Sequence, residues 1–121
     1  NAYKRIAAIG SKAELDDVLD ELIDRYGEPP YEVINLLNIS YLRSLASRAG
    51  IMKITQKDNS VTLTYAPGTE INFERVFAEI EKQKGKCIFS AGGTAAIVFN
   101  VKGYSYPAMS DWISKFLENI L

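Results

Sequence analysis

The sequence GIMKITQKDNSVTLTY, residues 50–65, is where the chain changes from a helical to an extended pattern. Residues on both sides of Asp58-Asn59-Ser60 alternate in polarity with a period of two, which is typical of two strands joined by a turn. Gly50 ends the apolar helical repeat that precedes this stretch. We therefore expect a β-hairpin here, and a boundary between a helical part over 1–50 and a strand-containing part over 51–121.

Upstream of this boundary, glycines and capping residues divide the chain into helical segments. Ser11-Lys12-Ala13-Glu14 is a capping box, in which the Ser and Glu side chains satisfy free backbone groups at a helix start. Gly27 and the following Glu28-Pro29-Pro30 stop that helix and force an extended connector. The segment over 31–49 is apolar around more than half of its circumference, so we expect it to be central and to pack on more than one neighbour. Three helices are predicted, over 3–9, 12–26 and 31–49.

Downstream of the hairpin, the same order of elements occurs a second time. Asn72 is expected to cap a helix whose buried stripe is Phe73, Val76, Phe77 and Ile80, with Glu79 outside the stripe. Two strands then follow over 86–90 and 94–100, and Pro107 fits the first turn of a last helix. The prediction is one α+β domain over 1–121 with the order αααββαββα. Its N-terminal helices should pack on a four-stranded, largely antiparallel sheet with two covering helices.

The composition excludes several classes of function. The chain has 121 residues, of which 47% are hydrophobic, with one Cys and no His. Zinc sites and His-based triads are therefore excluded, and we expect Cys87 to be a small buried residue rather than a nucleophile. No apolar run approaches the ~18 residues of a membrane span, and no signal peptide begins the chain. We expect a cytoplasmic protein without membrane contact, and because residue 1 is Asn, a domain cut from a longer chain.

The acidic residues are concentrated in one segment. The whole chain has a net charge of -1, but residues 14–32 contain eight acids and one Arg, which leaves about +6 on the rest. Helical spacing places four of these acids on the face opposite the predicted buried face of the 12–26 helix, which consists of Leu15, Val18, Leu19, Leu22, Ile23 and Tyr26. A straight helix splays carboxylates apart, which disfavours a metal site. Either a solvated face or a docking face for a basic partner accounts for Asp17, Asp20, Glu21 and Asp24.

Motifs that would indicate an enzyme lack the required context. Leu19-Asp20-Glu21-Leu22 resembles the Asp-Glu pair that holds magnesium in ATP motors, but it lies in the middle of a helix. There is no G-x-x-x-x-G-K-[ST] loop to bind nucleotide phosphates. We predict no catalytic residue, no metal site and no cofactor in this segment.

Two stretches in the N-terminal half carry a resemblance to a known family. Tyr3-Lys4-Arg5-Ile6-Ala7 and the later stretch ELIDRYGEPP, residues 21–30, resemble the C-terminal domain of bacterial transcription-repair coupling factors, the Mfd family. Leu36-Leu37 and Tyr41-Leu42-Arg43 follow the same family pattern, as does the entry of the long helix into the first strand.

This resemblance implies a regulatory role within a larger ATP-dependent DNA translocase. The parent protein would bind RNA polymerase, UvrA and DNA, and would use ATP and Mg. The C-terminal domain would dock on the UvrA-binding module of the same chain and restrain the motor until stalled polymerase is engaged. Carried onto this sequence, the docking contacts are Glu21 and Asp24, with Asp17 and Asp20 in support, and the segment itself is not an enzyme.

The positive charge outside residues 14–32 leaves one alternative open. A nucleic-acid-binding accessory domain of a DNA repair helicase would use that charge against phosphates. A salt-sensitive gel shift with DNA would favour this alternative, whereas no shift at low salt would count against it.

Overall fold

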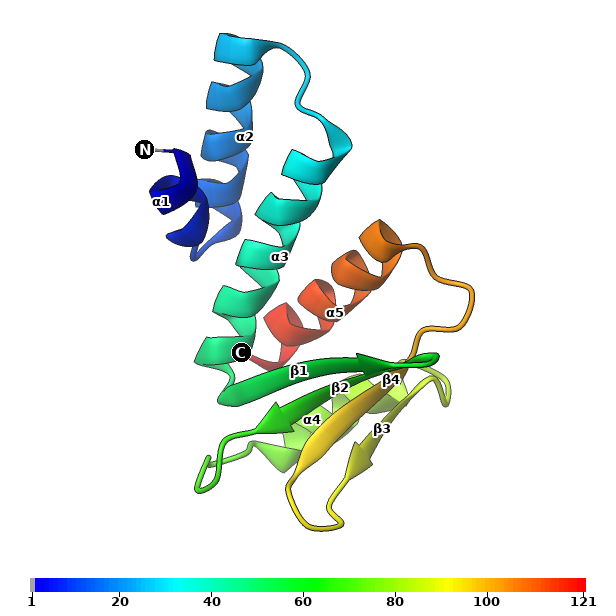
Figure 1. The fold of residues 1–121 in the computed structure, drawn as a ribbon. Coiled ribbons are helices and arrows are strands. Elements are labelled where there is room, and N and C mark those ends of the chain that lie inside the picture. The colour runs from blue at the N-terminus through cyan, green and yellow to red at the C-terminus, as the bar shows by residue number, and fades with distance from the viewer. Residues whose placement is uncertain (1) are drawn as a thin grey trace.

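The computed structural model describes residues 2–121, with side chains from Lys4 onward, so the side chain of Tyr3 in the family stretch lies outside the described residues. It confirms the α+β class and the element order αααββαββα (Figure 1). None of the helices in residues 2–121 is long and apolar enough to cross a membrane. The elements are α1 (Ala2–Ala7), α2 (Lys12–Tyr26), α3 (Tyr31–Arg48), β1 (Ile51–Lys57), β2 (Ser60–Tyr65), α4 (Phe73–Glu81), β3 (Cys87–Ser90), β4 (Ala96–Asn100) and α5 (Tyr106–Ile120).

The helix starts use the predicted polar caps. The Ser11 hydroxyl accepts a hydrogen bond from the Glu14 backbone N–H at 3.1 Å. The Glu14 carboxylate accepts from the backbone N–H of Gly10 at 2.9 Å, so it reaches one residue further back than in the usual capping box. Asn72 caps α4 through the N–H of Arg75. Local sequence therefore determines where these two helices begin.

The sheet has the order β1-β2-β4-β3, with every neighbouring pair antiparallel. Val61 of β2 pairs with Phe99 of β4, and Leu63 pairs with Ile97. All four side chains are buried, and they form the centre of the core. Because β2 and β4 are central, each of the two hairpin-plus-helix units supplies one inner and one outer strand.

Helices α4 and α5 cover the same face of this sheet. Phe73 of α4 contacts Phe89 of β3 edge-to-face at 5.6 Å between ring centroids. Phe99 makes edge-to-face contacts with Trp112 and Phe116 of α5. The opposite face, which carries residues such as Thr62 and Thr64, has no covering helix among the described elements (Figure 1).

Helix α3 is central, as predicted, and contacts α1, α2, α5 and β1. Its buried residues lie between Leu37 and Ala46, and the first turn and a half of the helix contains none. The α2–α3 hairpin projects away from the sheet, and α1 lies beside the part of α2 nearer the sheet (Figure 1). The far end of the hairpin therefore has only two helices to bury its side chains.

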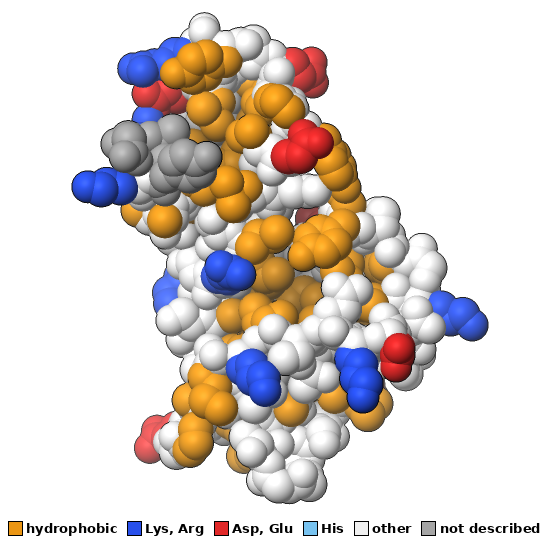
Figure 2. Space-filling view, in the orientation of Figure 1, with side chains coloured by type: hydrophobic (Ala, Val, Ile, Leu, Met, Phe, Trp, Pro, Cys, Tyr) orange, Lys and Arg blue, Asp and Glu red, His pale blue; other side chains and the backbone are white. Residues whose placement is uncertain are grey.

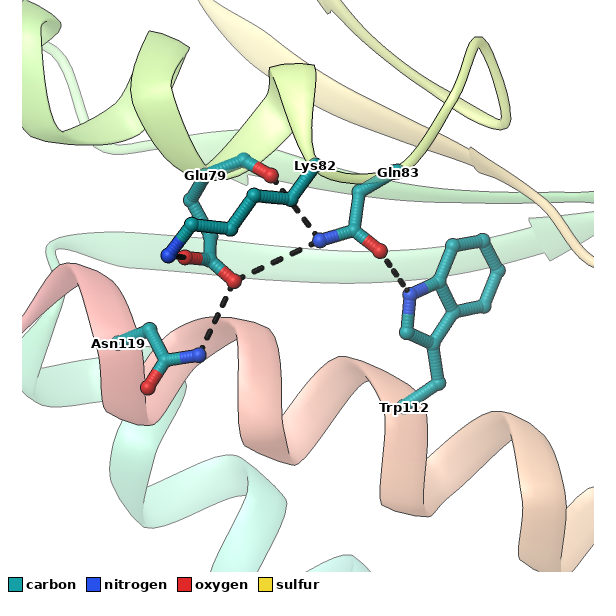
Figure 3. Close-up of polar contacts among 5 residues, drawn as sticks. All are labelled: Glu79, Lys82, Gln83, Trp112 and Asn119. Atoms are coloured by element: carbon teal, nitrogen blue, oxygen red, sulfur yellow. Dashed lines mark hydrogen bonds and ion pairs between the residues drawn. The ribbon is translucent and has the colours of Figure 1, made fainter.

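The position of Glu79 on α4 differs from the expectation. The sequence placed this acid outside the buried stripe, yet only 6% of the residue is exposed, whereas Phe73 and Phe77 are about half exposed. The cause is α5, which packs against α4 and supplies Asn119 to the Glu79 carboxylate at 3.0 Å. Lys82 pairs with the other carboxylate oxygen, and Gln83 joins the same network to Trp112 (Figure 3). Buried carboxylates are retained where such partners satisfy them.

A second polar contact joins the helical part to α5. The Tyr41 hydroxyl of α3 donates to the Glu118 carboxylate, across 77 positions of sequence. Burial of the ring, together with this carboxylate, raises the pKa of Tyr41 to about 12. The phenol is therefore protonated over the whole neutral range, and it holds α3 against the last helix.

We expect Tyr41→Phe to lower the free energy of unfolding by about 1–2 kcal/mol at pH 7, because Glu118 loses its donor. Since the folded pKa of Tyr41 exceeds the ordinary value of 10, its stabilisation is present below pH 10 and is lost as the pH rises toward 12. Urea unfolding at pH 7 and pH 11.5 measures both effects.

The difference in the free energy of unfolding between wild type and Tyr41→Phe separates the effect of this tyrosine from other groups that titrate in alkali. Burial also raises the pKa values of Tyr65 and Cys87, so both proteins should lose stability in alkali. The difference in the free energy of unfolding between wild type and Tyr41→Phe should nevertheless be smaller at pH 11.5 than at pH 7. An equal difference at the two pH values would contradict the stabilising role of the Tyr41 hydroxyl.

Candidate functional site: the acidic face of helix α2

The face of α2 turned away from the core carries three exposed carboxylates. Asp17, Asp20 and Asp24 are spaced by three and four residues, and all three are exposed. None of them has an ion-pair or hydrogen-bond partner within residues 2–121. Like charges at this spacing repel by a few tenths of a kcal/mol per pair, so the cluster costs some stability in the isolated domain.

Glu21, the fourth predicted acid, is placed differently. Its carboxylate forms ion pairs with Arg5 of α1 and with Arg25 one turn along α2, the latter at 3.3 Å. The side chain is 32% exposed, because Glu21 lies at the margin of the acidic face that borders α1. Glu21 thus differs from the other three acids in that it is partly covered and its charge is already balanced inside the domain.

Two apolar side chains of α2 are exposed near the end of the hairpin, and one of them, Ile23, borders the acidic side of the helix. Ile23 is 44% exposed and Tyr26 is 75% exposed, although the sequence pattern assigned both to the buried face. Tyr31, at the start of α3, is 56% exposed at the same end of the hairpin. The physical reason is that α1 is only six residues long and covers only part of α2, where Val18 is buried.

These residues make the end of the hairpin a mixed acidic and apolar surface. We call its acidic side the α2 face and define it as Asp17, Asp20, Asp24 and the bordering Ile23, whereas Tyr26 lies on the other side of α2 with Arg5 and Leu22. Orange side chains are visible over the upper part of the molecule, where the hairpin lies (Figure 2). A surface with both aromatic groups and charges is typical of protein interfaces, in which the aromatic residues supply the buried contact area. The shortness of the first helix was the one sequence signal that could have revealed Ile23 and Tyr26.

Among residues 2–121, no three acids or cysteines come close enough to hold a metal ion together. Asp20 and Glu21 lie in the middle of α2, as predicted, and not at the end of a strand. Cys87 is buried, as predicted, and burial with the nearby Glu79 charge raises its thiol pKa to about 12, so it carries no nucleophilic thiolate at neutral pH.

Three comparisons with known proteins agree with one another. The family model described as the TRCF domain matches residues 1–76. The transcription-repair-coupling factor of Haemophilus influenzae is 37% identical over 81 residues, which cover 67% of this chain and 7% of that protein. The corresponding protein of Escherichia coli K12 is 26% identical over 118 residues, covering 98% of this chain and 10% of its own length.

A solved structure supports the fold over almost the whole chain. The crystal structure of the C-terminal domain of a transcription-repair coupling factor superposes with a TM-score of 0.89 at 24% identity, covering 98% of this chain and 76% of that one. The chain thus spans about a tenth or less of the curated relatives that it matches.

Proposed function

Because this chain belongs to the transcription-repair coupling factor family, we propose that it is a non-catalytic regulatory domain that docks on the UvrA-binding module of its parent protein. In the docked state it restrains the ATP-dependent DNA translocase, and engagement of stalled RNA polymerase releases it. The parent, a cytoplasmic protein, would supply the ATP and Mg site, while this domain would supply the docking contact.

One observation carries this proposal. Asp17, Asp20 and Asp24 are exposed together and lack partners within residues 2–121, while neighbouring acids such as Asp16 and Glu21 are paired with Lys12, Arg5 and Arg25. Three unbalanced carboxylates on one helix face favour a partner that presents Lys or Arg. The exposed Ile23, which borders these acids, would add an apolar contact.

Glu21 takes a secondary place in this proposal. Its two carboxylate oxygens already bind the guanidinium groups of Arg5 and Arg25, so a further cation would have to compete with them. We therefore assign the main docking charge to Asp20 and Asp24, with Asp17 in support. Glu21 would contribute mostly by fixing α1 against α2.

Charge reversal in the full-length protein tests the proposal. We expect Asp20→Lys with Asp24→Lys to weaken docking, and to raise UvrA binding or basal ATPase activity several-fold, because two attractive pairs become repulsive. The same change should reduce the salt dependence of docking, since exposed pairs are screened by salt. UvrA pull-down and steady-state ATPase assays at two salt concentrations measure these effects.

A matched control separates docking from general changes in charge. Asp111→Lys and Asp58→Lys also reverse two exposed acids, but these lie outside the α2 face. In this control variant, UvrA binding and basal ATPase activity should stay within about two-fold of the wild-type full-length protein. If UvrA binding and ATPase activity are the same in the wild-type protein and in the Asp20→Lys/Asp24→Lys variant, the α2 face is not the docking surface.

A further inference from the structure

A groove lies between α3, α5 and strand β1, away from the α2 face. Its volume is about 590 Å³, and apolar side chains such as Leu42, Met109 and Ile113 form its walls. Among the described residues that line it, Arg43 and Lys53 are cations and none is an acid. Figure 2 shows a cluster of orange side chains in the middle of this face of the molecule, with blue side chains beside and below it.

Strand β1 forms one side of this groove and is also an open edge of the sheet. It is the first strand in the order β1-β2-β4-β3, and every residue from Met52 to Lys57 is exposed. The other edge strand, β3, has four residues against seven in β1, and α4 packs against it. A long exposed edge presents unpaired backbone groups to which another strand can bind.

The register identifies which backbone groups of β1 are free. The N–H of Tyr65 donates to Ala95, on the β4 side of β2, so by alternation Thr64 and Thr62 point their backbone groups toward β1. Their register partners, Lys53 and Thr55, therefore use their backbone groups to pair with β2. The intervening Ile54 and Gln56 direct their N–H and C=O groups to the open edge.

The two faces of β1 have different chemistry. Ile54 and Gln56, whose backbone groups are free, place their side chains in the groove. Thr55 and Lys57 alternate with them and lie on the uncovered face of the sheet, as does Lys53, which also borders the groove. Neither Lys53 nor Lys57 has an ion-pair partner among the residues that the structure describes.

These lysines also disfavour a second copy of the chain as the occupant. An antiparallel pair of β1 strands about a two-fold axis would bring the lysines of both copies onto one face. Like charges opposite each other destabilise a sheet, and lysines on edge strands are a known protection against such pairing. The edge therefore favours a strand of opposite charge.

We propose that β1 and its groove bind an extended acidic segment of a partner protein, which adds as a fifth strand to the sheet. The segment would alternate apolar residues with Asp or Glu. Its apolar side chains would enter the groove beside Ile54, and its carboxylates would lie opposite Lys53 and Lys57 on the other face. Backbone hydrogen bonds to Ile54 and Gln56 would supply affinity, and the alternating pattern would supply specificity. This proposal is independent of docking through the α2 face.

A synthetic peptide tests the proposal directly on the 121-residue chain. The probe is a fluorescent peptide of four Glu-Val repeats with blocked ends, and fluorescence anisotropy measures its binding. We expect saturable binding that Lys53→Glu weakens about ten-fold, because an attractive cross-strand pair becomes repulsive. Lys84→Glu, which makes the same charge change beyond α4, should alter the affinity less than two-fold. Lys53→Gln should give an intermediate loss, and circular dichroism confirms that each variant is folded.

Two further peptides distinguish strand addition from simple charge attraction. N-methylation of a Glu-Val peptide at alternate residues removes the N–H donors along one of its two edges. Of the two possible peptides, only the one methylated on the edge that faces β1 should lose binding. A Lys-Val peptide should not bind. Equal losses for Lys53→Glu and Lys84→Glu would overturn the proposal, as would unchanged binding of both N-methylated peptides. Displacement of the probe by single-stranded DNA, or occupation of the edge in a dimer of the chain, would also overturn it.

Discussion

Phe99→Ala is expected to lower the free energy of unfolding by about 3–5 kcal/mol, which is a large part of the 5–15 kcal/mol typical of a whole domain. Phe99 is 0% exposed at the centre of the sheet. Its ring contacts Trp112 and Phe116 edge-to-face, with centroids 5.1 and 5.0 Å away. Truncation removes both aromatic contacts and leaves a cavity under α5, and urea unfolding at neutral pH measures the loss.

Two other variants keep this prediction testable if Phe99→Ala fails to fold. Phe99→Leu should cost less than the alanine change, because it retains most of the buried volume. Ile88→Ala removes an apolar side chain from the neighbouring strand β3, but Ile88 is 56% exposed, so its cost should stay below about 1 kcal/mol. Similar losses for Ile88→Ala and Phe99→Ala would contradict the central position of Phe99.

Gly50→Ala is expected to lower the free energy of unfolding by about 3 kcal/mol, although it adds a single methyl group. Gly50 joins α3 to β1 with a φ of +86°, a conformation that is unfavourable for residues with a Cβ. The added Cβ would also lie 2.4 Å from Cγ2 of Thr69, whose hydroxyl is fixed by a 2.7 Å hydrogen bond to the Ala66 carbonyl. Backbone strain and this clash add together at the junction of the two parts of the domain.

A double variant separates the two causes. Thr69→Ser removes Cγ2 but keeps the hydroxyl, so Gly50→Ala combined with Thr69→Ser should recover part of the lost stability. The remaining loss then measures the backbone strain together with the 3.1 Å contact to Oγ1 of residue 69, which Ser retains. Gly92→Ala is the control, because no atom lies within 4 Å of its Cβ position and its φ is not in the positive range. If Gly50→Ala and Gly92→Ala have the same unfolding free energy in urea, the prediction is wrong.

The features that sequence predicted correctly depend on neighbours along the chain. The change of period at Gly50, the caps at Ser11 and Asn72, and the stop at Gly27 all act within four residues. Such local signals gave the element order and the α+β class. They also placed Asp17, Asp20 and Asp24 on one exposed face, because helical spacing alone decides that.

The features that sequence missed depend on neighbours far along the chain. Glu79 is buried because Asn119 of α5 reaches it, 40 residues away. Glu21 is paired because α1 brings Arg5 beside it. Ile23 and Tyr26 are exposed because no described element covers the far end of the hairpin. Periodicity identifies the apolar side of a helix, but it does not say how much of that side another element reaches.

The long central helix has a geometric consequence for how the domain can be used. Helix α3 has 18 residues, so it is about 27 Å long at 1.5 Å per residue. Its first residues follow the end of α2, and its second half lines the groove beside β1. The helix is therefore a rigid connection between the hairpin that carries the α2 face and the groove beside β1.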